Sequence, residues 1–182
     1  MIDLVFLDQS GFCPTLPTGY GWGRLGRRLV VRHEAPQGRR VNVVGALAPY
    51  DPAGPRLVFE TRRKAEGRYD AAAHLAFVRR LATETAGARP CVVVLDNYSV
   101  HHSQAVKDAL PDLAATGIHF CFLPPYSPEL NPIEPVWRQL KYQDIPERSH
   151  PTDTALQAAV ESALAARANH LRESTTNLPR PA

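Results

Sequence analysis

The hydrophobic and polar positions along the chain predict five short strands. Most of the apolar runs are continuous rather than alternating, which is typical of strands buried on both faces. Two runs close on an aspartate: LVFLD ends at Asp8 and CVVVLD ends at Asp96. A DPAG turn at residues 51–54 predicts a hairpin between the strand at residues 41–47 and the strand at residues 56–60. The five predicted strands span residues 3–8, 41–47, 56–60, 91–96 and 118–123.

Helical spacing predicts four helices between and after these strands. Ala73, Phe77 and Leu81 share one face of the first helix, and Pro111 is expected to bend or divide the second. The four predicted helices span residues 70–86, 102–115, 133–142 and 152–172, followed by a frayed tail.

The resulting order, β-β-β-α-β-α-β-α-α, predicts an α/β protein with a mixed five-stranded sheet flanked by helices. We expect residues 1–143 to form the core. Residues 144–182 are expected to add a helix and tail that pack on the core or trail from it.

Composition narrows the class of protein. Hydrophobic residues make up 44% of the 182 residues and charged residues 21%, which indicates a folded domain with a real core. No apolar run is long enough to cross a membrane, and the N-terminus reads as a strand rather than a signal peptide. Cys91 and Cys121 lie in apolar runs and are expected to be reduced core thiols, which favours the cytoplasm.

Charge is distributed unevenly, although the net charge is only +3. Arginines outnumber lysines by 18 to 3, and six of them fall within residues 24–40 beside one acid. This bias is compatible with a polyanionic partner and equally with solvated loop arginines. Tyr20 and Trp22 in the same loop could stack on bases or pack on the sheet. The arginines considered as candidates for contacting DNA are Arg24, Arg27 and Arg28.

Two acids are distinguished by their position. Asp8 and Asp96 each end an apolar strand, and functional groups of open α/β sheets collect at the carboxyl ends of strands. If the two strands are parallel neighbours, the carboxylates lie side by side and need a cation to stay ionised together. An all-oxygen site suits Mg²⁺ or Mn²⁺ and not zinc. Capping or loop initiation is the structural alternative for each acid.

A third acid, Glu134, lies in the segment SPELNPIEPVWRQLK. Asn131 and Glu134 have the spacing of a capping box, whereas a helix that starts near Glu134, with Pro135 in its first position, fits equally well. On that helix Glu134, Arg138 and Lys141 share a polar face, which would suit a metal ion followed by a phosphate backbone. Spacing alone leaves capping, a solvated face and metal binding open.

Three segments together resemble one family. FLPPYSPELNPIEPVWRQLK resembles the signature of the mariner superfamily of transposases, in its bacterial insertion-sequence branch. VFLDQSGF and VVVLDNYSVHHS resemble the two aspartate blocks of that family, in the same order. The resemblance covers residues 3–142. It implies a DDE transposase catalytic domain with a ribonuclease H-like fold, in agreement with the element order above.

The resemblance also implies roles for individual residues. Asp8 and Asp96 correspond to the catalytic aspartates and Glu134 to the acid that completes the triad, while Glu129 matches a non-catalytic position. Together the triad would hold two Mg²⁺ or Mn²⁺ ions. Gln9 stands where the family often has Glu.

Asn97 and His101 match the middle block. Asn97 is a candidate for orienting Asp96 or a metal-bound water, and His101 for contacting a substrate phosphate. Loop hydrogen bonding and helix capping are the alternatives for both residues.

The implied function is metal-dependent DNA strand cleavage and strand transfer during transposition of an insertion sequence. Relatives carry helix-turn-helix modules ahead of the catalytic domain, whereas the first catalytic aspartate here is residue 8. We therefore expect a catalytic half that works with an upstream helix-turn-helix half, as a homodimer on DNA, at the nucleoid in the cytoplasm. The alternatives are a catalytically silent DNA-binding relic or inhibitor of transposition, and a standalone ribonuclease H-like nuclease.

Overall fold

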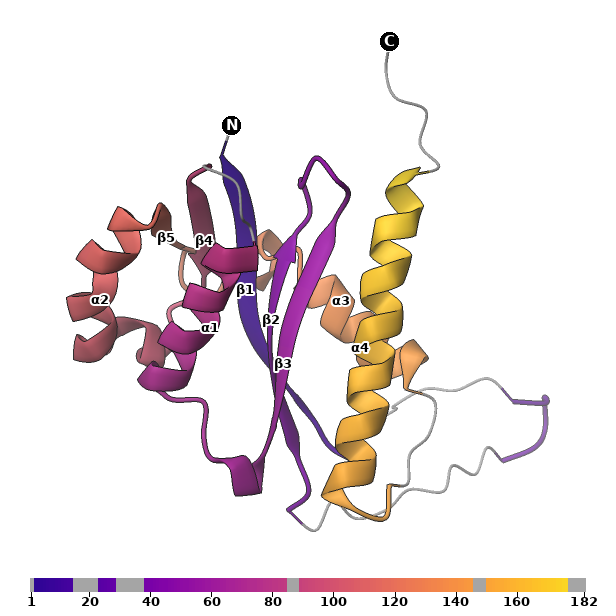
Figure 1. Cartoon of the computed structure of the whole chain (residues 1–182). Coiled ribbons are helices and arrows are strands. Elements are labelled where there is room, and N and C mark those ends of the chain that lie inside the picture. Colours follow the sequence, from indigo (N-terminus) through magenta and orange to yellow (C-terminus); the bar gives the residue numbers. More distant parts are fainter. Residues whose placement is uncertain (1, 15–22, 29–37, 85–88, 146–149, 177–182) are drawn as a thin grey trace.

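The computed structural model describes residues 2–14, 23–28, 38–84, 89–145 and 150–176. Its centre is one five-stranded sheet in the order β3-β2-β1-β4-β5 (Figure 1). β1 pairs antiparallel with β2 and parallel with β4, so the sheet is mixed, as the sequence predicts. The strands are β1 (Asp3–Phe12), β2 (Val41–Ala48), β3 (Arg56–Arg63), β4 (Cys91–Leu95) and β5 (Ile118–Phe122).

β1 is longer than its apolar run. The predicted strand ends at Asp8, whereas β1 continues to Phe12 because residues 9–12 pair with residues 41–44 of β2. The last β1–β4 pair is Phe6 with Val94, so this extension is paired on one side only. Asp8 therefore lies where the sheet opens between two neighbouring strands.

Helices cover both faces of the sheet. α1 and α2 lie over one face, and α3 and α4 lie over the other (Figure 1). None of the helices in the described ranges is long and apolar enough to cross a membrane. The helices are α1 (Ala71–Glu84), α2 (Gln104–Ala115), α3 (Glu134–Gln139) and α4 (Asp153–Thr176).

Three helices of the structure differ in detail from their predicted bounds. α2 begins at Gln104 because Ser99–His102 forms a separate 3₁₀ turn, and Pro111 lies inside α2 without ending it. α3 stops at Gln139 and passes into a π-helical turn, Leu140–Asp144, which changes the direction of the side chains that follow. α4 continues four residues beyond its predicted end.

Two hydrophobic cores fix these layers. One core joins α1 and α2 to the sheet through residues such as Leu7, Phe77 and Val93. The second joins α3 and α4 to the opposite face, with Trp137 and Leu164 fully buried in it. The proposed division at residue 143 stays a prediction, although α4 packs on β3 through this second core.

β5 is less buried than its apolar sequence predicts. It is an edge strand, and Cys121 and Phe122 are exposed on it. The prediction of a core thiol is therefore wrong for Cys121 and confirmed for Cys91.

Candidate active site

Asp8 and Asp96 come together at the opening between β1 and β4. The pairing of Phe6 with Val94 brings Asp8 beside Asp96 two residues further on. Both carboxylates line the same two cavities, one on either side of them. Asp96 and Glu134 both raise the pKa of Asp8 through their charge, so all three carboxylates interact at one place.

The pKa of Asp8 is raised to about 6. Burial is the largest cause, and the negative charges of Glu134 and Asp96 act in the same direction. A hydrogen bond from the backbone N–H of Gln9 and another from the indole of Trp137 oppose the shift. Asp8 is thus a carboxylate that a nearby cation would stabilise strongly in its ionised form.

Trp137 holds the Asp8 side chain. Its Nε1–H donates a 2.8 Å hydrogen bond to Oδ2 of Asp8, and the indole is only 2% exposed. The ring fits because residue 45, directly opposite Asp8 on β2, is glycine. A Cβ at Gly45 would lie 2.5 Å from Cη2 of Trp137. One carboxylate oxygen of Asp8 is therefore anchored by the indole.

Sequence reasoning missed this contact, because it selected only Glu134, Arg138 and Lys141 on this helix as candidates, and not Trp137. Two signals were present. Trp137 follows Glu134 by three residues, so both lie on neighbouring positions of one helical face. Gly45 interrupts an otherwise apolar strand, and glycine within a strand often marks the close approach of another group.

Glu134 is the first residue of α3. Its backbone N–H donates to the carbonyl of Asn131 at 3.1 Å, and the helix start has no side-chain cap. Of the two starts open from the sequence, the structure has the one near Glu134, with Pro135 second in the helix. The Glu134 carboxylate is therefore not used for capping, and it lines a cavity with Asp8 and Asp96.

Asp96 is oriented by the turn that follows β4. The backbone N–H of Tyr98 donates to Oδ1 of Asp96 at 3.1 Å. Nδ1 of His101 lies 3.2 Å from the same oxygen and 3.1 Å from the Asp96 carbonyl. Since both of these partners are acceptors, Nδ1 carries the proton. The hydrogen bond from His101 is the largest cause that lowers the pKa of Asp96, so this carboxylate stays ionised.

His101 is buried against Asp96. It is 2% exposed, which leaves it no surface for the phosphate contact considered from the sequence. A second histidine, His74 of α1, packs against it with ring centroids 4.6 Å apart. Burial lowers the pKa of His74 to about 3, and its Nδ1 lies 3.1 Å from the hydroxyl of Tyr69. No sequence pattern singled out His74.

Asn97 ties the loop after β4 to the end of β5. Its Nδ2 donates to the carbonyl of Leu123 at 2.7 Å, and its Oδ1 lies 3.2 Å from Nε2 of His102. The ring of His102 stacks on Phe122. The loop hydrogen bonding considered for Asn97 is therefore what the structure shows.

The basic candidates occupy different places. Lys141 lies near the acids. Burial lowers its pKa, and the charges of Glu134 and Asp8 oppose this shift. Its Nζ lies 5.5 Å from the centroid of the Phe12 ring. Arg138 is exposed on α3. Tyr20 and Trp22 fall outside the described residues. Three further arginines are exposed and line neither cavity: Arg24, Arg27 and Arg28.

Comparison with known proteins identifies the family. The sequence profile of the DDE superfamily endonuclease family matches residues 3–157, which is most of the chain. The chain belongs to the DDE superfamily endonucleases. This confirms the resemblance to DDE transposases seen in the sequence. No curated protein sequence matches the chain.

Solved structures share the fold of this DDE endonuclease. The Mos1 strand transfer complex matches with a TM-score of 0.65 at 18% identity, over 93% of this chain and 49% of that one. A Mos1 mariner paired-end complex with Mn matches with a TM-score of 0.68 at 15% identity, over 93% and 50%. An intasome of simian T-cell lymphotropic virus, in complex with a PP2A regulatory subunit, matches with a TM-score of 0.58 at 14% identity, over 99% and 56%.

These matches establish a ribonuclease H-like fold for the chain. The chain spans about half the length of the structures that it matches.

The residues at the site of this DDE endonuclease fit a hard divalent cation. All three donors are carboxylates, which suit Mg²⁺ and Mn²⁺. Burial raises the pKa of Asp8 most, and the charges of Glu134 and Asp96 raise it further, so a cation here would favour its ionised form. Within the described residues, no three His, Cys, Asp or Glu side chains are close enough to enclose one ion.

Proposed function

We propose that this chain is a transposase catalytic domain that cleaves DNA strands and joins them to target DNA with the help of divalent metal ions. The observation that carries the proposal is the convergence of Asp8, Asp96 and Glu134, with the pKa of Asp8 raised by burial and by the other two charges. Family membership and the shared fold support the same reaction class.

In this proposal Asp8, Asp96 and Glu134 would together hold two Mg²⁺ or Mn²⁺ ions. When bound, such ions lower the pKa of an attacking water or 3′ hydroxyl and offset charge at the leaving oxygen. The negative charge that raises the pKa of Asp8 would be neutralised by the same ions.

The other residues of the site hold the carboxylates in place. Trp137 anchors one oxygen of Asp8, which restricts the rotation of that side chain. His101 and the Tyr98 backbone do the same for Asp96 and keep it ionised. Lys141 places a cation beside Glu134 and Asp8, where a DNA phosphate would approach.

The proposed partners are the DNA ends of the element and the target DNA. Strand transfer between two ends favours a homodimer on DNA, and the similar structures include paired-end and strand transfer complexes of Mos1. We further propose a helix-turn-helix half that reads the element ends, and a location at the nucleoid.

The test is a cleavage and joining assay with Mg²⁺ or Mn²⁺, using supercoiled plasmid and a short duplex with a free 3′ hydroxyl. Asp96→Asn keeps an acceptor for Tyr98 and His101 but removes the charge, so we expect metal-dependent products to disappear. Asp112→Asn, at an exposed acid of α2, is the matched control and should retain activity.

A silent DNA-binding relic gives a different result. In that case wild type and Asp96→Asn bind DNA equally and neither forms products. If products stay absent after a helix-turn-helix half is supplied in trans, the proposal of an active enzyme is overturned.

A further inference from the structure

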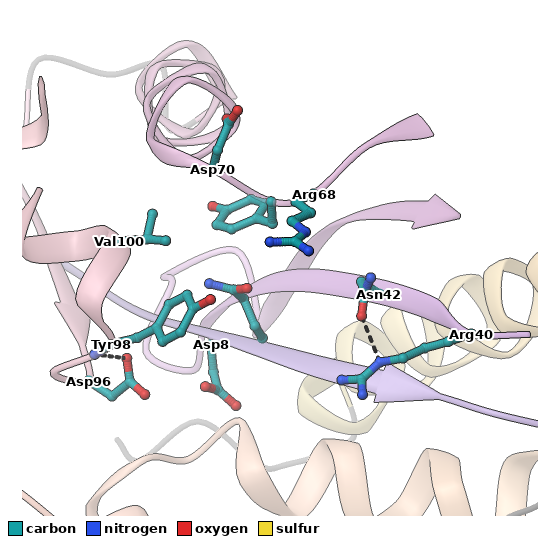
Figure 2. Close-up of a pocket in the computed structure, with 10 residues that line it drawn as sticks. Asp8, Arg40, Asn42, Arg68, Asp70, Asp96, Tyr98 and Val100 are labelled. Atoms are coloured by element: carbon teal, nitrogen blue, oxygen red, sulfur yellow. Dashed lines mark hydrogen bonds between the residues drawn. The ribbon is translucent and has the colours of Figure 1, made fainter. Parts of the chain in front are cut away.

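A second polar site adjoins the carboxylates on the α1 side of the sheet. It is a cavity of about 580 Å³ with Asp8 and Asp96 along one side (Figure 2). A third carboxylate, Asp70, also lines it, but Oδ1 of Asp70 accepts from the backbone N–H of Ala73 at the start of α1. The remaining polar side chains away from Asp8 and Asp96 include hydrogen-bond donors that carry no negative charge. They come from Gln9, Arg40, Asn42 and Arg68.

Arg40 is held by neighbouring residues at this cavity. Its Nε–H donates a 2.8 Å hydrogen bond to Oδ1 of Asn42, which fixes the plane of the guanidinium and leaves its two Nη groups available (Figure 2). The guanidinium lies against the backbone of β1 at Gly11, where an added Cβ would overlap it. Glycine at position 11 therefore leaves room for the Arg40 guanidinium beside β1.

Arg68 enters from the segment that leads into α1. Its carbonyl accepts a 3.3 Å hydrogen bond from Nη1 of Arg62, and two residues later Asp70 accepts from the backbone N–H of Ala73. This stretch of backbone is therefore held at both ends. Arg40 and Arg68 take part in none of the ion pairs among the described residues.

The charges define what this cavity can hold. Arg40 and Asn42 lie side by side, Arg68 lines the cavity nearer to α1, and Asp8 and Asp96 line another side of it (Figure 2). Two guanidinium groups without carboxylate partners favour an anion with several acceptor oxygens, and phosphate is matched well by guanidinium donors.

We propose that this cavity binds a non-scissile phosphate of the DNA strand, a neighbour of the phosphate that reacts at Asp8 and Asp96. This inference rests on the proposed function, which identifies the bound polyanion as a DNA strand. Arg40 and Arg68 hold the phosphate, and Asn42 keeps Arg40 in place. Binding here positions the strand so that the reacting phosphate meets the carboxylates.

The first measurement is the affinity for a fluorescent short single-stranded DNA by anisotropy, in EDTA so that no chemistry occurs. Arg40→Gln and Arg68→Gln should each weaken binding roughly tenfold, the size expected for a charged hydrogen bond. Each should also lower the slope of log K against log salt by about 0.7, the value for one phosphate contact on a single strand. Arg79→Gln is the matched control, because Arg79 is exposed on α1 and does not line the cavity.

The second measurement separates phosphate contact from a structural role. The same DNA is made with neutral methylphosphonate linkages, and wild type and Arg40→Gln should then bind it with equal affinity. If the variant still binds the neutral DNA about tenfold more weakly, or if Arg79→Gln weakens binding of charged DNA as much, the proposal is overturned. Since no cleavage is needed, an absence of metal-dependent products even after a helix-turn-helix half is supplied would overturn the proposed function and leave this result standing.

Discussion

Trp137 reaches Asp8 through the space left by Gly45. The indole N–H donates to Oδ2 of Asp8 at 2.8 Å, and the ring occupies the position where a side chain at residue 45 would lie. A strand, its antiparallel neighbour and a helix distant in sequence thus meet at one carboxylate. The arrangement couples the packing of the second core to the geometry of the proposed metal site.

Replacing Trp137 by phenylalanine should weaken metal-dependent activity by about 10-fold to 100-fold, the range found when a residue that orients a metal ligand is removed. The variant keeps an aromatic ring but loses the N–H, so Asp8 loses one of the hydrogen bonds that hold it. The measurement is the Mn²⁺ concentration needed for half-maximal cleavage, which should rise. Phe12→Leu is the control, since Phe12 contacts the Trp137 ring edge-on and its loss leaves the hydrogen bond intact. An equal rise in Phe12→Leu would point to packing alone.

Gly45→Ala should destabilise the protein by about 1–3 kcal/mol, because the new methyl overlaps Trp137 and crowds Ile133. A smaller ring would relieve this overlap. In the double variant with Trp137→Phe, the loss of unfolding free energy should therefore be smaller than the sum of the two single losses. Urea unfolding of the four proteins gives this coupling directly. Strictly additive losses would contradict the proposed steric cause.

The stability of the metal-free protein should depend on Asp8 and pH. Its pKa is about 6 in the folded state against 3.8 for the ordinary group, so stability is lost as pH rises from about 4 to above 6. Asp8→Asn removes this loss. It should raise the free energy of unfolding by up to about 3 kcal/mol at pH 8, since a tenfold change in the protonation equilibrium is worth about 1.36 kcal/mol. At low pH the two proteins should be alike.

Urea unfolding in EDTA at both pH values measures this difference, with Asp112→Asn as the exposed control. Added Mg²⁺ or Mn²⁺ should stabilise the wild type and have little effect on Asp8→Asn, because a ligand of the folded state stabilises it by mass action. Equal stabilisation of both proteins by the metal would exclude Asp8 as a ligand.

His101→Leu should weaken Mn²⁺ binding by roughly 10-fold, because it removes the donor that orients Asp96 and lowers the pKa of that carboxyl. His101→Asn offers a side-chain N–H near the position of Nδ1 and should restore most of the affinity. Calorimetric titration with Mn²⁺ compares the two variants. If the asparagine variant binds as weakly as the leucine variant, the hydrogen bond to Asp96 is not the reason for the loss.

The local pattern of apolar and turn residues was sufficient to predict much of the fold. The continuous apolar runs located all five strands, and the DPAG turn located the hairpin between β2 and β3. The ends of the elements could be predicted less well from the sequence. The polar residues after Asp8 belong to β1 only because β2 lies beside them, and the π-helical turn after Gln139 has no signature in the hydrophobic spacing.

The candidate site shows the same division. Asp8, Asp96 and Glu134 were chosen from strand ends and motif blocks, and the structure brings their side chains to one place. Three contacts could not be predicted from the sequence: His101 with Asp96, Trp137 with Asp8, and Arg40 with Gly11. Each depends on contacts between segments that are distant along the chain.

Hydrophobic runs and motif blocks are local properties of the chain, and they were enough to establish the order of the elements, the family and the three acids. How these acids are held and charged depends on tertiary contacts. Burial and neighbouring carboxylates raise the pKa of Asp8, whereas a buried histidine lowers that of Asp96. A pKa depends on the charges, donors and solvent around a group in three dimensions, and two chemically identical side chains differ here for that reason.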